Sequence, residues 1–409
     1  MTDDQPLHCA FMPLLDSLLL LVAREQGFAA REGVQLVLHR ETSWANIRDR
    51  LAVGQIQAAH LLAPMPLACN LGLTPLGGNL IAPMALGLGG NAVTLSRSLW
   101  AEMQMPTIRT VIDPTSGAAA LSAVIRQRAR QGDPALRLGV VHQHSVHNYE
   151  LRYWLASCGI DPRTDLDIRI VAPPLMVDAL QSNQIDGFCV GEPYNTIAVQ
   201  QDVGRILTVK SAIWRSSPEK VLGVSTDWAR EHPETLAALI RALYRAAQWC
   251  DQIIAEGRQQ VLADLLAAPT CLDLPAHCLL PALAGQLPAG GDAIIEQPDF
   301  FLPFARAATF PWISHAMWIY SQMVRWGDVN HDDQNAAVVA ASFRPDIYRR
   351  SLEPAGWPVP GANSKVEGAL VDQTVVGASQ GTLELGPDGF FDGRIFDPAQ
   401  LDGYLASLD

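Results

Sequence analysis

Short apolar runs alternate with amphipathic stretches along much of the chain, from about residue 35 to about residue 256. Residues 34–41 have the character of a strand, and helical spacing follows between Ser43, a favourable N-cap, and Gly54, a favourable residue just beyond a helix end. The same alternation returns further along and predicts strands at 137–142, 167–172 and 186–191 and helices at 148–159 and 173–184. Strands that alternate with helices favour an α/β fold with parallel sheets.

The two ends of the chain differ from this central pattern. An apolar run from Leu14 to Val22 contains Asp16 and is too short to span a bilayer, so it predicts a buried first helix. The residues before it are acidic, unlike those of a secretory signal, which leads us to expect a cytoplasmic protein. A long helix is expected at 232–252, where the central pattern ends. Helical aromatic spacing resumes at 311–327 and a further helix is expected at 342–353, whereas 357–386 has few signals of order.

Size and composition limit the possible functions. A chain of 409 residues exceeds what one hydrophobic core usually supports, so two domains or lobes are expected. The net charge of -13 comes without a dense basic stripe, which argues against direct contact with nucleic acid. Such a protein can still bind an anion through local donors. The odd number of cysteines, seven, suits reduced thiols, and without CxxC or HExxH pairs no metal site is predicted.

Polar or aromatic groups follow or precede strands at four places, where open α/β sheets bind ligands. These places are residues 42–44, 89–91, 142–148 and 216–220. The third opens a helix, whose free N–H groups and positive dipole end favour anions.

Each place also has a purely structural interpretation. Trp44 can fill the core, and the glycines before Asn91 can simply make turns. Ser145 or Asn148 can cap the helix, and Lys220 can be a solvated surface residue.

Longer segments resemble a known family. Residues 39–68, 148–195, 213–252 and 390–408 are similar to the solute receptors of nitrate and bicarbonate ABC transporters, and the resemblance extends from about residue 30 to about residue 400. It implies a two-lobed periplasmic-binding-protein-like fold of type II, with mostly parallel sheets flanked by helices and a ligand in the interlobe cleft. The first lobe is expected to comprise 1–96 and 222–409, which includes a C-terminal extension, and the second lobe 97–221.

The resemblance also implies the ligand-binding residues. They are Trp44 beside the anion, Asn91 where the family has glutamine, His147, the Pro173–Pro174 pair and Lys220. Asparagine shortens one donor arm. The bicarbonate receptors are acidic at the position of Lys220, so the lysine favours nitrate or nitrite.

Nitrate is planar, weakly basic and poorly hydrated, and it tolerates an aromatic neighbour. One lysine charge, a histidine donor and helix N–H groups can replace its water. No ligands for a metal, flavin or molybdenum cofactor are evident in the sequence, so we expect no cofactor and no enzymatic activity.

Three functions fit such a receptor. Without an export signal, the chain resembles the NasS type of cytoplasmic nitrate sensor, which implies that it holds a response-regulator-like, RNA-binding antiterminator of the NasT type until nitrate or nitrite binds. The alternative is a solute-binding receptor of a nitrate or bicarbonate ABC transporter. A thiamine-pyrimidine synthase also has a similar fold, but its cysteine-rich iron motif is missing here.

Overall fold

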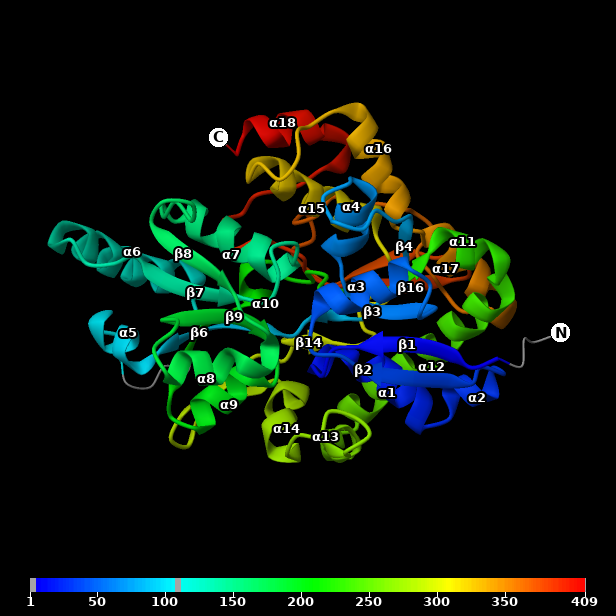
Figure 1. Ribbon diagram of the computed structural model, residues 1–409. Helices are drawn as coiled ribbons and strands as arrows, with labels where there is room; N and C mark the ends of the chain where they lie inside the picture. Colours follow the sequence, from blue (N-terminus) through cyan, green and yellow to red (C-terminus); the bar gives the residue numbers. More distant parts are fainter. Residues whose placement is uncertain (1–4, 107–111, 409) are drawn as a thin grey trace.

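The computed structural model describes residues 5–106 and 112–408, which form two lobes, each built on a five-stranded sheet with helices on its faces (Figure 1). The sheet of the first lobe has the strand order β2-β1-β3-β11-β4. Its strands are β1 (Leu7–Phe11), β2 (Leu36–Arg40), β3 (Ala58–Leu62), β4 (Leu80–Ala85) and β11 (Lys220–Ser225).

The sheet of the second lobe has the order β10-β6-β9-β7-β8. Its strands are β6 (Asn91–Ser96), β7 (Leu136–Val140), β8 (Leu166–Ile170), β9 (Gly187–Gly191) and β10 (Gly204–Val209). The strands predicted at 34–41, 137–142, 167–172 and 186–191 are thus confirmed as β2, β7, β8 and β9.

One strand in each sheet runs against the others, and it is the strand that the chain enters on arriving from the other lobe. β11 is antiparallel to β3 and β4, and β6 is antiparallel to β9 and β10, whereas β1, β2 and β3 pair in parallel, as do β7, β8 and β9. The expected two-lobed α/β fold with mostly parallel sheets is confirmed.

The chain passes from one lobe to the other slightly earlier than the expected lobe boundaries, both before β6 and before β11. Residues 91–96 were expected in the first lobe, but they form β6 of the second sheet. Lys220 and Val221 were expected in the second lobe, but they pair with β3 of the first. The reason is that the apolar residues of β6 and β11 would suit either sheet. Hydrophobicity alone therefore does not show which sheet each strand joins.

Helices cover both faces of each sheet. In the first lobe these are α1 (Leu18–Glu25), α2 (Phe28–Arg31), α3 (Trp44–Ala52), α4 (Pro64–Asn70), α11 (Thr226–Glu231), α12 (Pro233–Ala255), α13 (Gln259–Ala267) and α14 (Ala276–Ala284). In the second lobe they are α5 (Arg97–Glu102), α6 (Pro114–Gln131), α7 (Val146–Ser157), α8 (Met176–Gln181), α9 (Tyr194–Gln200) and α10 (Lys210–Ile213). Short turns of 3-10 helix, η1 (Leu15–Ser17) and η2 (Pro173–Leu175), precede α1 and α8.

The first apolar run is a buried helix, as expected. Leu18 to Ala23 of α1 are all buried, because the helix packs against α12 beneath the first sheet. Within residues 5–106 and 112–408, no helix has the length and apolar character needed to cross a membrane. All seven cysteines are free thiols.

Residues 313–408, here called the C-terminal extension, contact both lobes. The extension contains α15 (Ile313–Arg325), α16 (Asp333–Ser342), α17 (Pro345–Leu352), α18 (Leu401–Ala406) and a hairpin of β15 (Thr374–Gly377) and β16 (Thr382–Leu385). The hairpin lies in the segment for which the sequence has few signals of order, because its short strands alternate weakly.

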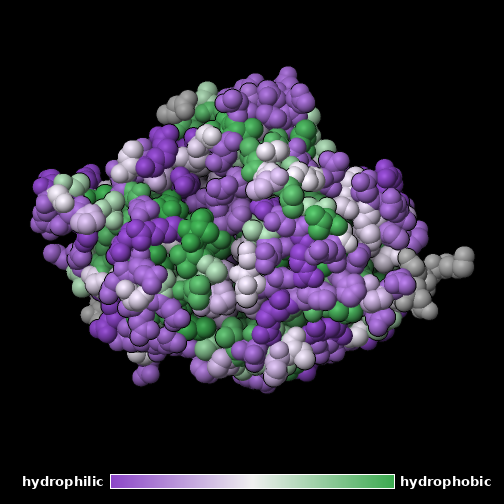
Figure 2. All heavy atoms as spheres, in the orientation of Figure 1, coloured by the Kyte–Doolittle hydropathy of each residue, from purple (hydrophilic) through white to green (hydrophobic). Residues whose placement is uncertain are grey.

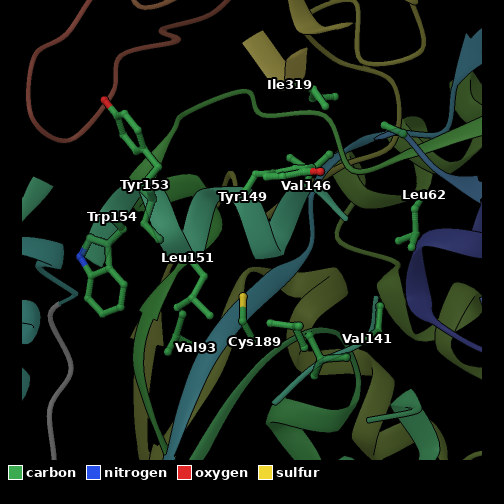
Figure 3. Packing of buried hydrophobic residues seen from close by; sticks show 14 of the residues in the cluster. Leu62, Val93, Val141, Val146, Tyr149, Leu151, Tyr153, Trp154, Cys189 and Ile319 are labelled. Atoms are coloured by element: carbon green, nitrogen blue, oxygen red, sulfur yellow. The ribbon is translucent and has the colours of Figure 1, made fainter. Parts of the chain in front are cut away.

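The extension joins a continuous hydrophobic cluster. α15 packs against α7 of the second lobe and α4 of the first. Figure 3 shows Ile319 of α15 and Leu62 of β3 in the same cluster as Tyr149 of α7 and Cys189 of β9. On the face drawn in Figure 2, hydrophobic side chains gather toward the middle, where the lobes meet, and the outer surface is largely hydrophilic. This buried apolar contact stabilises the lobes in their close arrangement.

Candidate functional site

A buried lysine lies where the chain returns to the first lobe. Lys220, the first residue of β11, places Nζ 2.7 Å from Asp16 Oδ2 and 3.0 Å from Glu219 Oε1. All three residues are at most 4% exposed. Burial disfavours each charge, yet the two carboxylates raise the pKa of Lys220 and the ammonium lowers the pKa of Asp16. Lys220 is therefore a cation and not the solvated surface residue of the structural alternative.

Glu219 links this lysine to the second lobe. Its Oε1 lies 2.8 Å from His147 Nδ1 of α7, and its Oε2 is ion-paired with Lys210 of α10. Burial opposes ionisation, but the two lysines hold the pKa of Glu219 well below its ordinary value. Glu219 is thus an ionised carboxylate that contacts Lys220 of the first lobe and His147 and Lys210 of the second.

His147 is already hydrogen-bonded at both ring nitrogens. Its Nε2 accepts from the backbone N–H of Val141 at 3.4 Å and lies 3.1 Å from Ser145 Oγ. With Nε2 as acceptor, Nδ1 carries the proton and donates to Glu219. Burial lowers the pKa of His147, so the ring is neutral. His147 faces the site through Glu219, and its protein partners leave it no free donor for an anion.

Trp44 and His60 form the first-lobe wall beside Lys220. The ammonium lies 5.5 Å from the centre of the Trp44 ring, which meets the His60 ring edge-on at a centroid distance of 5.3 Å. His60 Nε2 is 3.1 Å from Asp16 Oδ1, and its Nδ1 accepts from the Met12 N–H at 3.4 Å. Trp44 Nε1 is buried without a hydrogen-bond partner among the described residues. Such an orphaned donor is costly unless a ligand accepts from it.

Asn91 approaches the same region from the second lobe. It begins β6, is fully buried, and neither its Oδ1 nor its Nδ2 has a hydrogen-bond partner in the described part of the chain. A Cβ added to Gly191 would lie 3.2 Å from Asn91 Oδ1 and 3.4 Å from Asp16 Oδ2. Asn91 and Asp16 therefore converge on one point from different lobes, and glycine at 191 leaves that point open.

The glycines before Asn91 serve a structural purpose. Gly89 has a φ of 75°, and a Cβ there would lie 2.2 Å from the carbonyl oxygen of Phe300. This close approach belongs to the pairing of β5 (Leu88–Gly89) with β14 (Phe301–Leu302). The glycines thus allow backbone to meet backbone, and the turn interpretation of these two residues fits the structure.

The remaining candidates lie further from the lysine. Ser145 Oγ accepts from the Asn148 N–H, so the start of α7 is capped by its own side chain. His144 Nδ1 lies 3.0 Å from the Tyr149 hydroxyl, which donates to Asp328 of the C-terminal extension. Pro173 opens η2 after the edge strand β8, and β9 and β7 lie between that strand and β6. The structure thus brings together Trp44, Asn91, His147 and Lys220, and places Pro173 on the far side of the second sheet.

The sequence analysis did not name Asp16, His60 and Lys210 as site residues. Each is an ionisable residue in or beside an apolar run, which is a usable signal because a charge inside a buried element requires a partner. Within residues 5–106 and 112–408, no group of three or more His, Cys, Asp or Glu side chains could hold a metal ion.

The charges of the cluster balance. Lys210 and Lys220 are matched by Asp16 and Glu219. Glu150, 3.7 Å from Lys210, is held in its neutral form because burial raises its pKa to about 8. The cluster is thus neutral overall, and the Lys220 ammonium together with the unpartnered side chains of Trp44 and Asn91 can hold a small polar ion.

Access to this cluster requires the lobes to separate. Lys220, Asn91, His147 and Trp44 are at most 2% exposed. The first lobe also donates a backbone hydrogen bond to the second, from Leu15 N–H to the Glu192 carbonyl at 2.9 Å.

Comparison with known proteins agrees with this geometry. The NMT1-like family model matches residues 2–267. The chain is 29% identical, over 97% of its length and 85% of the relative, to the nitrate/nitrite binding protein NrtA of Synechococcus elongatus. It is also 35% identical, over 86% of its length, to the nitrate import ATP-binding protein NrtC of Synechocystis, of which it spans only 50%.

Solved structures lead to the same family. The periplasmic nitrate-binding protein NrtA from Synechocystis superposes with a TM-score of 0.84 at 26% identity, covering 99% of this chain and 98% of that one. The alkanesulfonate-binding protein SsuA from Xanthomonas axonopodis shares the fold alone, with a TM-score of 0.56 at 14% identity over 83% of this chain and 97% of that one. The NrtA relatives confirm the prediction of a binding protein rather than an enzyme. The chain belongs to the NMT1-like family, and its resemblance to receptors of the NrtA type is confirmed.

Proposed function

We propose that this protein is a solute receptor that encloses nitrate or nitrite between its lobes at Lys220, as in nitrate ABC transport. The observation that carries the proposal is the convergence of one buried ammonium with two unpartnered buried donors, Trp44 Nε1 and Asn91 Nδ2. Three donors from both lobes suit a planar oxyanion, because each oxygen can accept a hydrogen bond. The NrtA relatives support nitrate or nitrite as the ligand.

Binding would also drive closure. Asn91 begins a strand of the second lobe, whereas Trp44 and Lys220 belong to the first. An anion that bonds to both sides stabilises the closed form over the open one, and only such differential contact can shift the equilibrium.

Calorimetric titration of the purified chain with nitrate, nitrite and bicarbonate tests the proposal. We expect heat from nitrate or nitrite and none after Lys220→Glu, because a third carboxylate then faces the ligand beside Asp16 and Glu219. Arg97→Glu is the matched charge reversal, at an exposed residue paired with Asp202. It should bind as the unchanged protein does. Nitrate affinity that survives Lys220→Glu in a folded protein would refute the site.

A nitrate sensor is the second candidate. The net charge of -13 favours a basic partner such as an RNA-binding antiterminator of the NasT type. The relatives reported above are transport proteins and favour the receptor. Cytoplasmic localisation and the antiterminator partner remain predictions. Size-exclusion chromatography with such an antiterminator, with and without nitrate, distinguishes the two: a complex that nitrate dissociates supports the sensor, and no complex supports the receptor.

A further inference from the structure

Asp16 holds the position that an anion needs. It lies in η1, inside an apolar run, and is 4% exposed. Its Oδ2 is 2.7 Å from the Lys220 ammonium, and its Oδ1 is 3.1 Å from His60 Nε2. The same Oδ2 points toward the open position at Gly191, which Asn91 approaches from the other lobe. An anion that reaches Lys220 beside Asn91 therefore arrives next to a carboxylate.

Few groups around Asp16 can offset a further negative charge. Lys220 faces it from β11 and His60 from β3. Glu219 shares the same ammonium from residues 214–219, here called the crossing segment, which connect α10 to β11. From the second lobe, Asn91 approaches the same open position at Gly191 that Asp16 faces. His60 Nε2 carries its proton toward Asp16, because its Nδ1 accepts from the Met12 N–H. A negative ligand here would meet two carboxylates around one lysine.

We propose that Asp16 is a further binding residue, which takes up a proton when nitrate or nitrite binds and donates it as a hydrogen bond to the anion. This inference rests on the proposed function. The anion replaces Asp16 on Lys220, and an O–H bond forms at Asp16 Oδ2 with a proton from solvent. Nothing is oxidised or reduced. The neutral acid then supplies a donor where the carboxylate would repel the ligand.

Proton uptake is favourable because two opposing effects already act on the pKa of Asp16. Burial favours its neutral form, whereas Lys220 first and His60 second keep its pKa below the ordinary value. When the anion engages Lys220, that support weakens while burial remains. The acid is then the favoured form. A proton carried in with the anion keeps the enclosed cluster electrically neutral.

The test is calorimetric titration of the full chain with sodium nitrate in two buffers of different ionisation enthalpy, phosphate and Tris. We expect uptake of about one proton per nitrate, and an affinity that falls about tenfold for each pH unit between about pH 6 and about pH 8. Asp16→Asn, which keeps a donor but cannot ionise, should bind nitrate without proton uptake and without pH dependence.

Asp388→Asn is the matched control, since Asp388 is a buried carboxylate paired with Lys365 in the C-terminal extension. It should retain the proton uptake of the unchanged protein. Nitrate binding without proton uptake, or uptake that persists in Asp16→Asn, would overturn the role of Asp16 alone. Absence of binding by nitrate and nitrite at every pH would overturn the proposed function and this inference with it. If Asp16→Asn does not fold, the buffer dependence of the unchanged protein decides.

Discussion

Lys220 and Asp16 form a buried ion pair, with Nζ 2.7 Å from Oδ2, although one begins β11 and the other lies in the turn before α1. The pair ties the strand that returns from the second lobe to the start of the chain. Its energetic value depends on both members being present, because a buried charge without a partner is far more costly than a buried pair.

Removal of the lysine alone should destabilise the protein. Lys220→Met leaves Asp16 and Glu219 with less compensation, and we expect a loss of about 3–5 kcal/mol in the free energy of unfolding. The double variant Lys220→Met with Asp16→Asn should be more stable than Lys220→Met alone, because it no longer buries the unpaired carboxylate of Asp16. Urea denaturation of the two single variants and the double variant measures the coupling. Strictly additive losses would show that the pair contributes nothing.

Replacement of Asn91 by leucine should stabilise the ligand-free protein and abolish nitrate binding. Since both of its polar atoms are buried without partners, Asn91→Leu removes a desolvation cost, and we expect the ligand-free protein to gain about 1 kcal/mol. The thermal shift induced by nitrate should vanish at the same time. Asn195→Leu is the control, because Asn195 is buried but hydrogen-bonded to Thr94 and Val190. That substitution should destabilise the protein, and a loss of stability in Asn91→Leu as well would show that Asn91 has an unrecognised partner.

Glu150 should make the protein less stable as the pH rises from about 4.5 to about 8. Burial raises its pKa from 4.5 to about 8, so the neutral form stabilises the fold fully below pH 4.5, and this contribution is lost as the pH rises through about 8. Glu150→Gln mimics the neutral acid and should flatten the decline in unfolding free energy over that interval.

Glu367 provides a control of opposite sign. Burial opposes its ionisation, but Lys365 and His315 hold its pKa at about 2, so its contribution is present above pH 4.5 and is lost as the pH falls through about 2. Glu367→Gln should therefore alter the acid side of the stability profile. Denaturation midpoints from acid to alkaline pH measure both effects, and a slope between about pH 4.5 and about pH 8 that Glu150→Gln leaves unchanged would contradict the assignment.

Trp214 should be the anchor of the crossing segment. Its ring is fully buried, stacks on Phe390 at a centroid distance of 4.8 Å and lies 4.6 Å from Trp318. Trp214→Ala should cost about 3–5 kcal/mol, because the packed C-terminal extension cannot collapse into the space. Trp326→Ala, at a partly exposed tryptophan, should cost less. Guanidinium denaturation compares the two, and equal losses would show that the extension does not depend on Trp214.

The sequence by itself determined the class of fold and the location of most elements. Alternation of apolar runs with helical spacing predicted β2, α3, β7, α7, β8, α8 and β9, since strand and helix periodicities are local properties of the chain. The motifs that resemble the receptor family also named Trp44, Asn91, His147 and Lys220, which the structure brings to one cluster. Local patterns could do this because each of these residues sits at the start or end of a strand or helix.

Only the tertiary structure decided which groups face one another. Asp16 lies in an apolar run that looked merely structural, yet it meets Lys220 because β1 and β11 belong to the same sheet, on either side of β3. His147 was expected to donate to the anion, and in the structure its Nδ1 lies 2.8 Å from Glu219 Oε1. Such contacts join residues far apart in the chain, and their energies depend on burial and on the sum of nearby charges, neither of which any local pattern contains.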